Sequence, residues 1–222
     1  MRTIATLKKY YLRNFRYRSI YKKFKDFTMI PKHVYSANLD LCQKYAMVNG
    51  SIVECGTWKG GMIGGIAYML GPDRKYMLFD SFEGLPPAKE IDGESAISYQ
   101  ADDTSPDYFN NCTASEESAH EAMKISGASN VSITKGWFKE TLQKAHFEDG
   151  IAILRLDGDW YDSTLEILNA LFPKVNHGGL IIIDDYYYWE GCSKAVHDYL
   201  STHKREERIS TYFMGVCYII KK

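Results

Sequence analysis

Short apolar runs recur along the chain and are separated by stretches with helical character. The runs are continuous, with few polar residues inside them, and they lie at residues 51–55, 76–79, 131–134, 151–156 and 180–183. Continuous apolar strands between helices are typical of a parallel sheet that is covered on both faces. The pattern therefore predicts an α/β fold of the Rossmann-like type, with a mostly parallel sheet and helices on both of its faces.

The segments next to these strands predict helices. One helix is expected over residues 39–48 and ends near Asn49-Gly50, where both residues accept left-handed geometry. A second is expected to begin within residues 59–65 and to end at Leu70, and a third is expected over residues 164–171.

Glycines mark turns in the last third of the chain. The pair Gly178-Gly179 predicts a turn immediately before the strand at 180–183. Residues 209–212 and 216–220, on either side of Met214-Gly215, predict an antiparallel hairpin. We expect this C-terminal hairpin to extend the parallel sheet at its edge.

The first 27 residues differ from the rest in composition. Nine Lys or Arg residues stand there against Asp26 alone, interleaved with Tyr and Phe. We therefore predict a basic, aromatic, helical N-terminal extension over 1–27 and one domain over 28–222. The favoured interpretation is a solvated helix that leans on the domain or on a second subunit. Contact with an anionic membrane or RNA is the alternative.

Charge and cysteine content narrow the class of protein. The 222 residues have a formal net charge of -1, so we expect a small acceptor and no nucleic-acid partner. The five cysteines are scattered without a C-x-x-C pair, which predicts reduced thiols in a cytoplasmic protein. No apolar run approaches the roughly 20 residues that cross a bilayer, and no signal-peptide pattern is present, so secretion is not expected.

An acidic residue and spaced glycines follow the first strand. Glu54, Gly56 and Gly60 form the pattern E-x-G-x-x-x-G at a turn from strand to helix. Such glycines allow a ligand close to the backbone, although they also suit a plain tight turn. The dinucleotide fingerprint G-x-G-x-x-G seats a pyrophosphate, whereas S-adenosylmethionine has no phosphate and fits the looser loop better. Asp80 ends the next strand, where a carboxylate can accept both ribose hydroxyls of either cofactor.

Four carboxylates follow two later strands. Asp157 and Asp159 come after residues 151–156, and Asp184 and Asp185 come after residues 180–183. Open α/β sheets bind ligands at these strand ends, and a bound cation would keep crowded carboxylates ionised. Oxygen ligands favour a hard ion, Mg2+ above all, with Mn2+ or Ca2+ as alternatives. Capping of the following helices is the structural alternative.

A divalent ion at these residues would have a chemical purpose. Transfer of a proton from an alcohol with a pKa near that of water, about 15.7, to an aspartate with a pKa of about 3.9 costs about 16 kcal/mol. An ion that binds the hydroxyl lowers that difference while a nearby carboxylate accepts the proton. Such an ion could also orient a vicinal diol, with one oxygen in line with the methyl donor.

Five ordered motifs span about residues 28–222. They are Glu54-Cys55-Gly56-Thr57-Trp58-Lys59-Gly60-Gly61, Asp80-Ser81-Phe82-Glu83-Gly84-Leu85-Pro86, Gly136-Trp137-Phe138-Lys139-Glu140-Thr141-Leu142, Arg155-Leu156-Asp157-Gly158-Asp159 with Tyr161 and Ser163-Thr164, and Asp184-Asp185-Tyr186. Together they resemble the macrocin O-methyltransferase family of metal-dependent sugar O-methyltransferases. The resemblance implies the class I methyltransferase fold and methyl transfer from S-adenosylmethionine to a sugar hydroxyl, in a glycoside or polysaccharide, with Mg2+.

The resemblance also implies roles for single residues. Asp159 would be the general base, and Mg2+ would bind Asp157, Asp184 and Asp185. The cofactor would contact Glu54, Gly56, Thr57, Gly60, Asp80, Ser81, Trp137 and Phe138. Core packing is the alternative role for the last two residues. The family and the aromatic N-terminus together favour a homo-oligomer such as a dimer.

Two features depart from the family pattern and leave the acceptor open. Trp160 replaces a smaller aliphatic residue, and the segment 187–189 is unusually aromatic. Aromatic faces stack on sugar rings and suit a flat phenolic acceptor equally well. The alternatives are therefore a catechol-like O-methyltransferase and, in another class, a nucleotide-cofactor oxidoreductase or a non-catalytic binding protein on the same fold.

Overall fold

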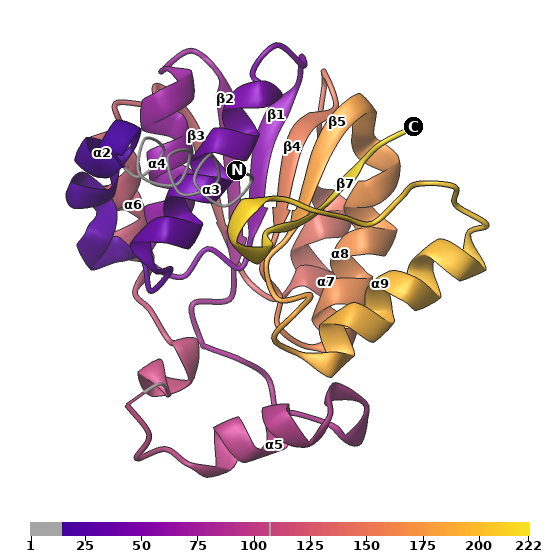
Figure 1. Ribbon diagram of the computed structural model, residues 1–222. Helices are drawn as coiled ribbons and strands as arrows, with labels where there is room; N and C mark the ends of the chain where they lie inside the picture. Colours follow the sequence, from indigo (N-terminus) through magenta and orange to yellow (C-terminus); the bar gives the residue numbers. More distant parts are fainter. Residues whose placement is uncertain (1–14, 107) are drawn as a thin grey trace, which may run out of the picture.

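A seven-stranded sheet runs through the computed structural model, which describes residues 15–106 and 108–222 (Figure 1). Its strands are β1 (Ser51–Cys55), β2 (Lys75–Asp80), β3 (Asn130–Lys135), β4 (Ile151–Leu156), β5 (Val175–Ile183), β6 (Ser210–Thr211) and β7 (Cys217–Ile220). The order is β3-β2-β1-β4-β5-β7-β6, and the pairs β5-β7 and β7-β6 are antiparallel whereas the others are parallel. The predicted mostly parallel sheet with an antiparallel C-terminal hairpin is confirmed.

Helices cover both faces of this sheet, as its continuous apolar strands predict (Figure 1). One face is covered by α2 (Arg18–Phe24), α3 (Lys32–Lys44), α4 (Gly61–Leu70) and α6 (Glu116–Ser126). The other face is covered by α7 (Phe138–Thr141), α8 (Tyr161–Leu171) and α9 (Glu190–Thr202). The short helix α5 (Glu94–Ala101) lies outside both layers.

Consecutive strand residues enter two separate apolar cores. Ile52 and Ile153 pack with α3 and α4, whereas Val53 and Leu154 pack on the opposite face with α8 and α9. Side chains alternate between the two faces of a strand, so a strand that is buried on both faces needs apolar residues at every position. This burial explains why β1 and β4 are mostly apolar, with Glu54 and Arg155 as their charged residues.

The predicted turn at Gly178-Gly179 is wrong, because β5 begins at Val175 and passes through both glycines. Gly178 has a φ of +77°, and the register between β4 and β5 shifts between Ile151 and Ile153. A glycine at positive φ inside a strand makes a local irregularity without ending the strand. The strand therefore continues to the acidic pair with its residues 180–183 in the expected place.

Residues 84–106 and 108–113 belong to an arm between β2 and α6 that the sequence did not predict (Figure 1). The arm holds η2 (Glu90–Asp92), α5 and η3 (Phe109–Cys112), and it extends from the edge of the sheet where the parallel strands end. The buried Asp92 accepts the backbone N–H of Tyr161 at 2.7 Å. A carboxylate that accepts a first-turn N–H caps a helix, so the arm caps α8.

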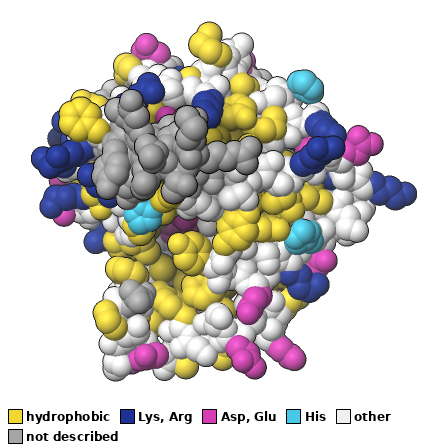
Figure 2. Space-filling view, in the orientation of Figure 1, with side chains coloured by type: hydrophobic (Ala, Val, Ile, Leu, Met, Phe, Trp, Pro, Cys, Tyr) yellow, Lys and Arg dark blue, Asp and Glu magenta, His cyan; other side chains and the backbone are white. Residues whose placement is uncertain are grey.

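The N-terminal segment packs on the domain through one face of α2. Tyr17, Ile20 and Phe24 are buried in the core beside α4, whereas Lys22 and Lys23 are exposed. Figure 2 shows Lys and Arg side chains gathered at the left, where α2 lies in Figure 1. Residues 1–14 of the predicted extension lie outside the described residues, and the division at residue 27 stays a prediction. Among the described helices, none has the length and apolarity to cross a membrane.

Substitution of Gly65 by alanine is expected to destabilise the fold, although alanine is the better helix former. An added Cβ would lie 1.8 Å from the hydroxyl oxygen of the buried Tyr35, which donates a hydrogen bond to Gly61 O. We expect Gly65→Ala to lower the free energy of unfolding in urea by about 1–3 kcal/mol. In a Tyr35→Phe background the added loss should be smaller, and an equal loss in both backgrounds would contradict this packing.

Candidate functional site

A cavity lies at the C-terminal ends of β1 and β4, where the strand order changes direction. From β1 the sheet continues through β2 and β3 on one side and through β4 and β5 on the other. Open α/β sheets bind ligands in the crevice at such a switch point. The wall of this cavity is formed by strand ends, by the two ends of the arm and by residues 27–30.

The loop after β1 is held by the carboxylate of Asp80 at the end of β2. Its Oδ2 accepts the backbone N–H groups of Thr57 and Trp58, each at 2.7 Å, and its Oδ1 accepts that of Phe82 at 2.7 Å. Burial raises the pKa of Asp80, and the three N–H donors oppose this rise. Asp80 therefore organises the candidate cofactor loop itself, in addition to any contact with a ligand.

The two glycines of this loop are required by packing within the protein. Gly56 has a φ of +81°, and a Cβ there would lie 1.6 Å from the carbonyl oxygen of Asp157. Gly60 has a φ of +78°, and its Cβ would lie 3.1 Å from Ala119 Cα in α6. The glycine spacing therefore reports how closely the loop approaches β4 and α6, and only Gly56 also lines the cavity.

A buried arginine joins the cofactor side of the cavity to its acidic side. Arg155 in β4 contacts Glu54 at 3.1 Å, Asp157 at 2.5 Å and Asp184 at 2.6 Å. Glu54 also accepts the Thr57 hydroxyl at 3.1 Å, and burial raises the pKa of Glu54 to about 7. One guanidinium thus faces three carboxylates, which leaves the acidic side negatively charged when all of them are ionised.

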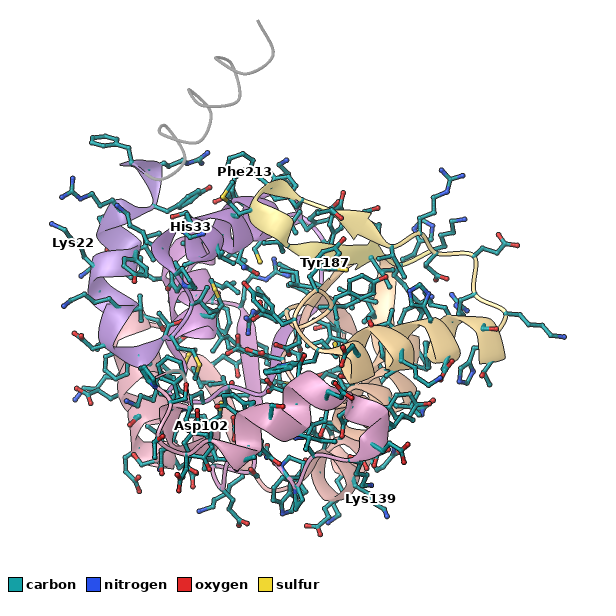
Figure 3. All side chains as sticks on the ribbon, turned by 60° about the horizontal axis from the view of Figure 1, so that its bottom comes forward. Lys22, His33, Asp102, Lys139, Tyr187 and Phe213 are labelled. Atoms are coloured by element: carbon teal, nitrogen blue, oxygen red, sulfur yellow. The ribbon has the colours of Figure 1, made fainter. Side chains whose placement is uncertain are left out.

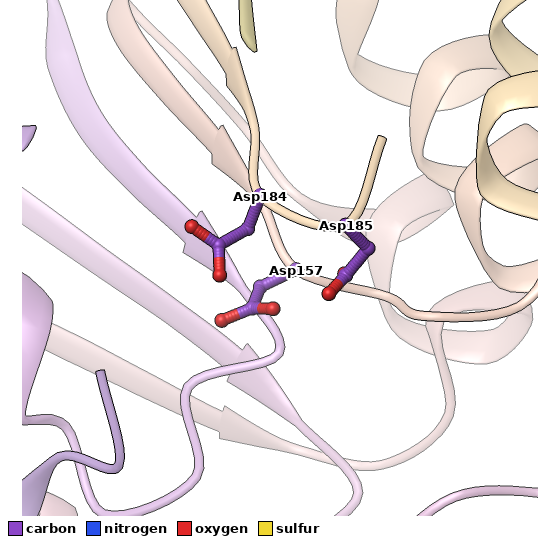
Figure 4. A group of neighbouring side chains, drawn as sticks. All are labelled: Asp157, Asp184 and Asp185. Carbon is purple, nitrogen blue, oxygen red and sulfur yellow. The ribbon is translucent and has the colours of Figure 1, made fainter. Parts of the chain in front are cut away.

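Asp157, Asp184 and Asp185 converge at the ends of β4 and β5 (Figure 4). One carboxylate oxygen from each lies within 4.8 Å of the others. Burial and the neighbouring carboxylates raise the pKa of Asp185 well above its usual value, and burial raises the pKa of Asp184 to about 6. Three convergent carboxylate oxygens with too little positive charge fit a hard divalent cation.

Asp159 lies beside this group with its backbone in the left-handed region, at a φ of +54°. Its N–H donates to Asp185 Oδ2 at 3.1 Å, and its Oδ1 accepts the indole N–H of Trp189 at 2.9 Å. Burial and the charge of Asp157 raise the pKa of Asp159 to about 8. A carboxylate with a raised pKa is a stronger base than an ordinary aspartate once it is ionised.

The aromatic residues that depart from the family pattern occupy different places. Trp160 is almost fully buried, and its indole N–H donates to Pro86 O in the arm at 2.9 Å. Tyr187 lies beside the C-terminal hairpin, where its hydroxyl contacts that of Thr211 in β6 (Figure 3). Neither side chain is free to stack on an acceptor in the cavity, and Trp189 instead contacts Asp159.

Every predicted site residue except Gly60 lines this one cavity. The structure thus brings Ser81, Trp137 and Phe138 together with the loop after β1 and with the four aspartates. Trp137 is partly exposed, so it is not a core residue. The assignment of each residue to cofactor, metal or proton transfer stays a prediction.

Sequence analysis missed several residues of the cavity. Residues 27–30 and Cys112 form part of its wall, although no local pattern marks them, and the arm residues 84–86 lie in a quoted motif that assigns them no role. Arg155 was quoted within a motif without a role. A charged residue inside an otherwise apolar strand was the signal, because a buried charge requires partners of opposite charge.

Comparison with known proteins identifies the family. The model of the macrocin O-methyltransferase family, TylF, matches residues 25–218. The chain is 37% identical over 160 residues to demethyldecarbamoylnovobiocin O-methyltransferase of Streptomyces niveus, which covers 68% of this chain and 58% of that protein. It is 31% identical over 182 residues to mycinamicin III 3''-O-methyltransferase of Micromonospora griseorubida, which covers 78% of this chain and 70% of that protein.

A solved structure shows the same fold. The O-methyltransferase NovP is similar with a TM-score of 0.73 and 30% identity, over 88% of this chain and 82% of that one. The motifs quoted from the sequence lie within the matched residues, and most of them surround the cavity at the switch point. The chain belongs to the macrocin O-methyltransferase family of S-adenosylmethionine-dependent O-methyltransferases.

Proposed function

We propose that this chain transfers a methyl group from S-adenosylmethionine to a hydroxyl of a sugar, in a glycoside or a polysaccharide. In this proposal Mg2+ binds Asp157, Asp184 and Asp185, and Asp159 is the general base. The observation that supports it most is that the three-carboxylate group and Asp159 share one cavity with the loop held by Asp80.

The cofactor side of the cavity fits a nucleoside with a charged tail. Asp80 Oδ1 accepts one hydrogen bond, from Phe82 N–H, and a carboxylate oxygen can accept two such bonds. A ribose hydroxyl can therefore bind there. Glu54 is an acidic partner for a cationic group, and the side chains of Trp137 and Phe138 offer apolar surface to the adenine. Thr57 and Ser81 supply polar groups at the cavity wall.

The acidic side fits a divalent ion and a proton transfer. The ion supplies Lewis-acid polarisation of a hydroxyl. Without a cation, the raised pKa of about 8 keeps Asp159 protonated at neutral pH, so a positive charge nearby is needed to make the base available.

The chemical step follows from these positions. Asp159 accepts the proton of the acceptor hydroxyl, and the oxygen forms a bond to the methyl carbon in line with the breaking bond to sulfur. Sulfur keeps the electron pair of that bond and leaves as the neutral thioether of S-adenosylhomocysteine. Asp157, Asp184 and Asp185 would hold the ion beside the acceptor, and Asp80 holds the donor loop.

The names of similar proteins support a sugar as the acceptor. The relatives include a 3''-O-methyltransferase of mycinamicin III and a 4'-O-methyltransferase of a rhamnosyl tetracenomycin from Streptomyces olivaceus. A catechol-like diol would use the same groups of this cavity and is the second candidate. The loop after β1 lacks the G-x-G-x-x-G motif with which an oxidoreductase of this fold binds its dinucleotide.

The oligomeric state, location and membrane contact of the enzyme stay predictions. A homo-oligomer and a cytoplasmic location are expected from the family and from the cysteine content. The apolar residues Ile20 and Phe24 of α2 are buried in the core, so this part of the N-terminal segment has no apolar face free for insertion into a membrane. Only its exposed cations could contact an anionic surface.

Removal of single carboxylates is expected to separate metal binding from proton transfer. Asp157→Asn and Asp185→Asn should abolish Mg2+-dependent methylation together with Mg2+ binding measured by calorimetry. Asp159→Asn should keep Mg2+ binding and lower kcat by about 10²–10⁴-fold. Transfer of label from methyl-labelled S-adenosylmethionine measures the rates. Full activity of the wild-type chain in excess EDTA would refute the metal role.

Stability of the metal-free protein is expected to fall as pH rises. The pKa of Asp159 is about 8 in the folded protein and about 3.9 when unfolded, so the native state binds the extra proton. This contribution is complete below pH 4 and is lost as pH rises to 8. Saturating Mg2+ should therefore raise Tm more at pH 8 than at pH 5.5, by about 5 °C at pH 8. Asp185→Asn is the control, and equal shifts at both pH values would contradict the account.

Acceptor class is tested directly with small probes. We expect methylation of methyl α-L-rhamnopyranoside or a related glycoside with a vicinal diol, and none of catechol, when products are measured by mass spectrometry. Methylation of catechol alone would replace the sugar assignment. In parallel calorimetry, binding of NAD without binding of S-adenosylhomocysteine would overturn the reaction class.

A further inference from the structure

Three aromatic residues pack together between the arm and Asp159. Tyr99 from α5 and Trp160 and Trp189, which precede α8 and α9, form edge-to-face contacts, with the two indole rings 5.1 Å apart. The ring centroids of Tyr99 and Trp189 are 5.6 Å apart. Rings that pack in this way fix one another, because rotation of one would remove contacts with the other two.

The two indole N–H groups have different partners. Trp160 donates to Pro86 O and so fastens the arm, whereas Trp189 donates to Asp159 Oδ1 at 2.9 Å. In residues 15–106 and 108–222, the Trp189 indole is the only recorded hydrogen-bond donor to the Asp159 carboxylate. The two tryptophans are thus a matched pair in which only one contacts the proposed base.

Asp159 needs such a partner because of its backbone. A non-glycine residue at a φ of +54° is strained, and strained residues persist where their surroundings hold them in place. The backbone N–H of Asp159 is held by Asp185 Oδ2 at 3.1 Å, but this bond leaves the side chain free to rotate. The indole of Trp189 removes that freedom.

We propose that Trp189 is a positioning residue for the methyl-transfer reaction: its indole N–H holds Asp159 Oδ1 and leaves Oδ2 as the oxygen that takes the acceptor proton. This inference rests on the proposed role of Asp159 as the base. In the step, the O–H bond of the acceptor breaks, its proton goes to Oδ2, and the hydrogen bond from Trp189 to Oδ1 is kept throughout. The ring contacts with Tyr99 and Trp160 keep the donor in place.

The hydrogen bond is tested by NMR of the four tryptophan indoles, Trp58, Trp137, Trp160 and Trp189, in the protein bound to S-adenosylhomocysteine. Single Trp→Phe variants assign the signals. We expect the Trp189 N–H to exchange slowly, and Asp159→Ala to shift its signal and speed its exchange, whereas the Trp160 N–H, which donates to Pro86 O, should keep its slow exchange. A Trp189 N–H that exchanges as fast as that of the partly exposed Trp137, or that ignores Asp159→Ala, would overturn the proposal.

The catalytic role is tested by the matched pair Trp189→Phe and Trp160→Phe, with methyl α-L-rhamnopyranoside as the probe acceptor. We expect Trp189→Phe to lower kcat by about 10–100-fold, as the loss of an orienting partner does. KM for the acceptor and the affinity for S-adenosylhomocysteine should change by no more than about twofold, because binding groups are untouched. Trp160→Phe keeps an aromatic ring against Trp189 and removes the bond to Pro86 O, so it should lower Tm through the arm and lower kcat less than Trp189→Phe does.

A third variant separates the hydrogen bond from the shape of the ring. Replacement of Trp189 by 3-benzothienylalanine keeps the bicyclic ring and removes only the N–H, so it decides the question if Trp189→Phe fails to fold. A wild-type kcat in this variant would overturn the positioning role. If Asp159→Asn loses its rate while the Trp189 variants keep theirs, only this inference fails; if Asp159→Asn keeps its rate, the base assignment fails first.

Discussion

Crowding of negative charge at the ends of β1, β4 and β5 is the constraint on which the rest of the site depends. The guanidinium of Arg155 faces Glu54, Asp157 and Asp184 at once, and Asp185 lies beyond its contacts. Buried carboxylates without enough positive charge take up protons, which is why several pKa values in the cavity are raised. In the proposed function, a divalent cation would supply charge where Arg155 does not reach and would make Asp159 available as the base.

The sequence predicts the sheet well because the relevant signal is local. Strands such as β1 and β4 are buried on both faces, so every position reports the burial. The four aspartates were placed at the sheet's C-terminal edge correctly because they closely follow β4 and β5. The arm was missed because its short helices depend on distant contacts, such as Asp92 with Tyr161, and the turn at Gly178 was wrong because a glycine at positive φ also fits inside an irregular strand.

The roles of side chains were harder to predict than their positions. Asp80 lies in the cavity as expected, yet its oxygens already accept three backbone N–H groups, which no spacing in the sequence reveals. Trp58, Phe82 and Asp159 all have positive φ at this site, although none is glycine. Carboxylate hydrogen bonds hold the first two through Asp80 and the third through Asp185, so acidic residues fix the backbone here as well as the ligands.

The arm is fastened to the body near its beginning, by Trp160 on Pro86 and by Tyr161 on Asp92, and near its end, by the indole of Trp58 on Thr113 O. Each anchor uses a backbone group on one side, so the anchors place few demands on the arm side chains between them, apart from Tyr99, whose ring packs on Trp160 and Trp189. The exposed side chains of this segment are therefore exchangeable. A protein engineer who keeps Asp92, Tyr99 and the three anchoring contacts can change them, and so alter the surface beside the cavity while the donor loop stays intact.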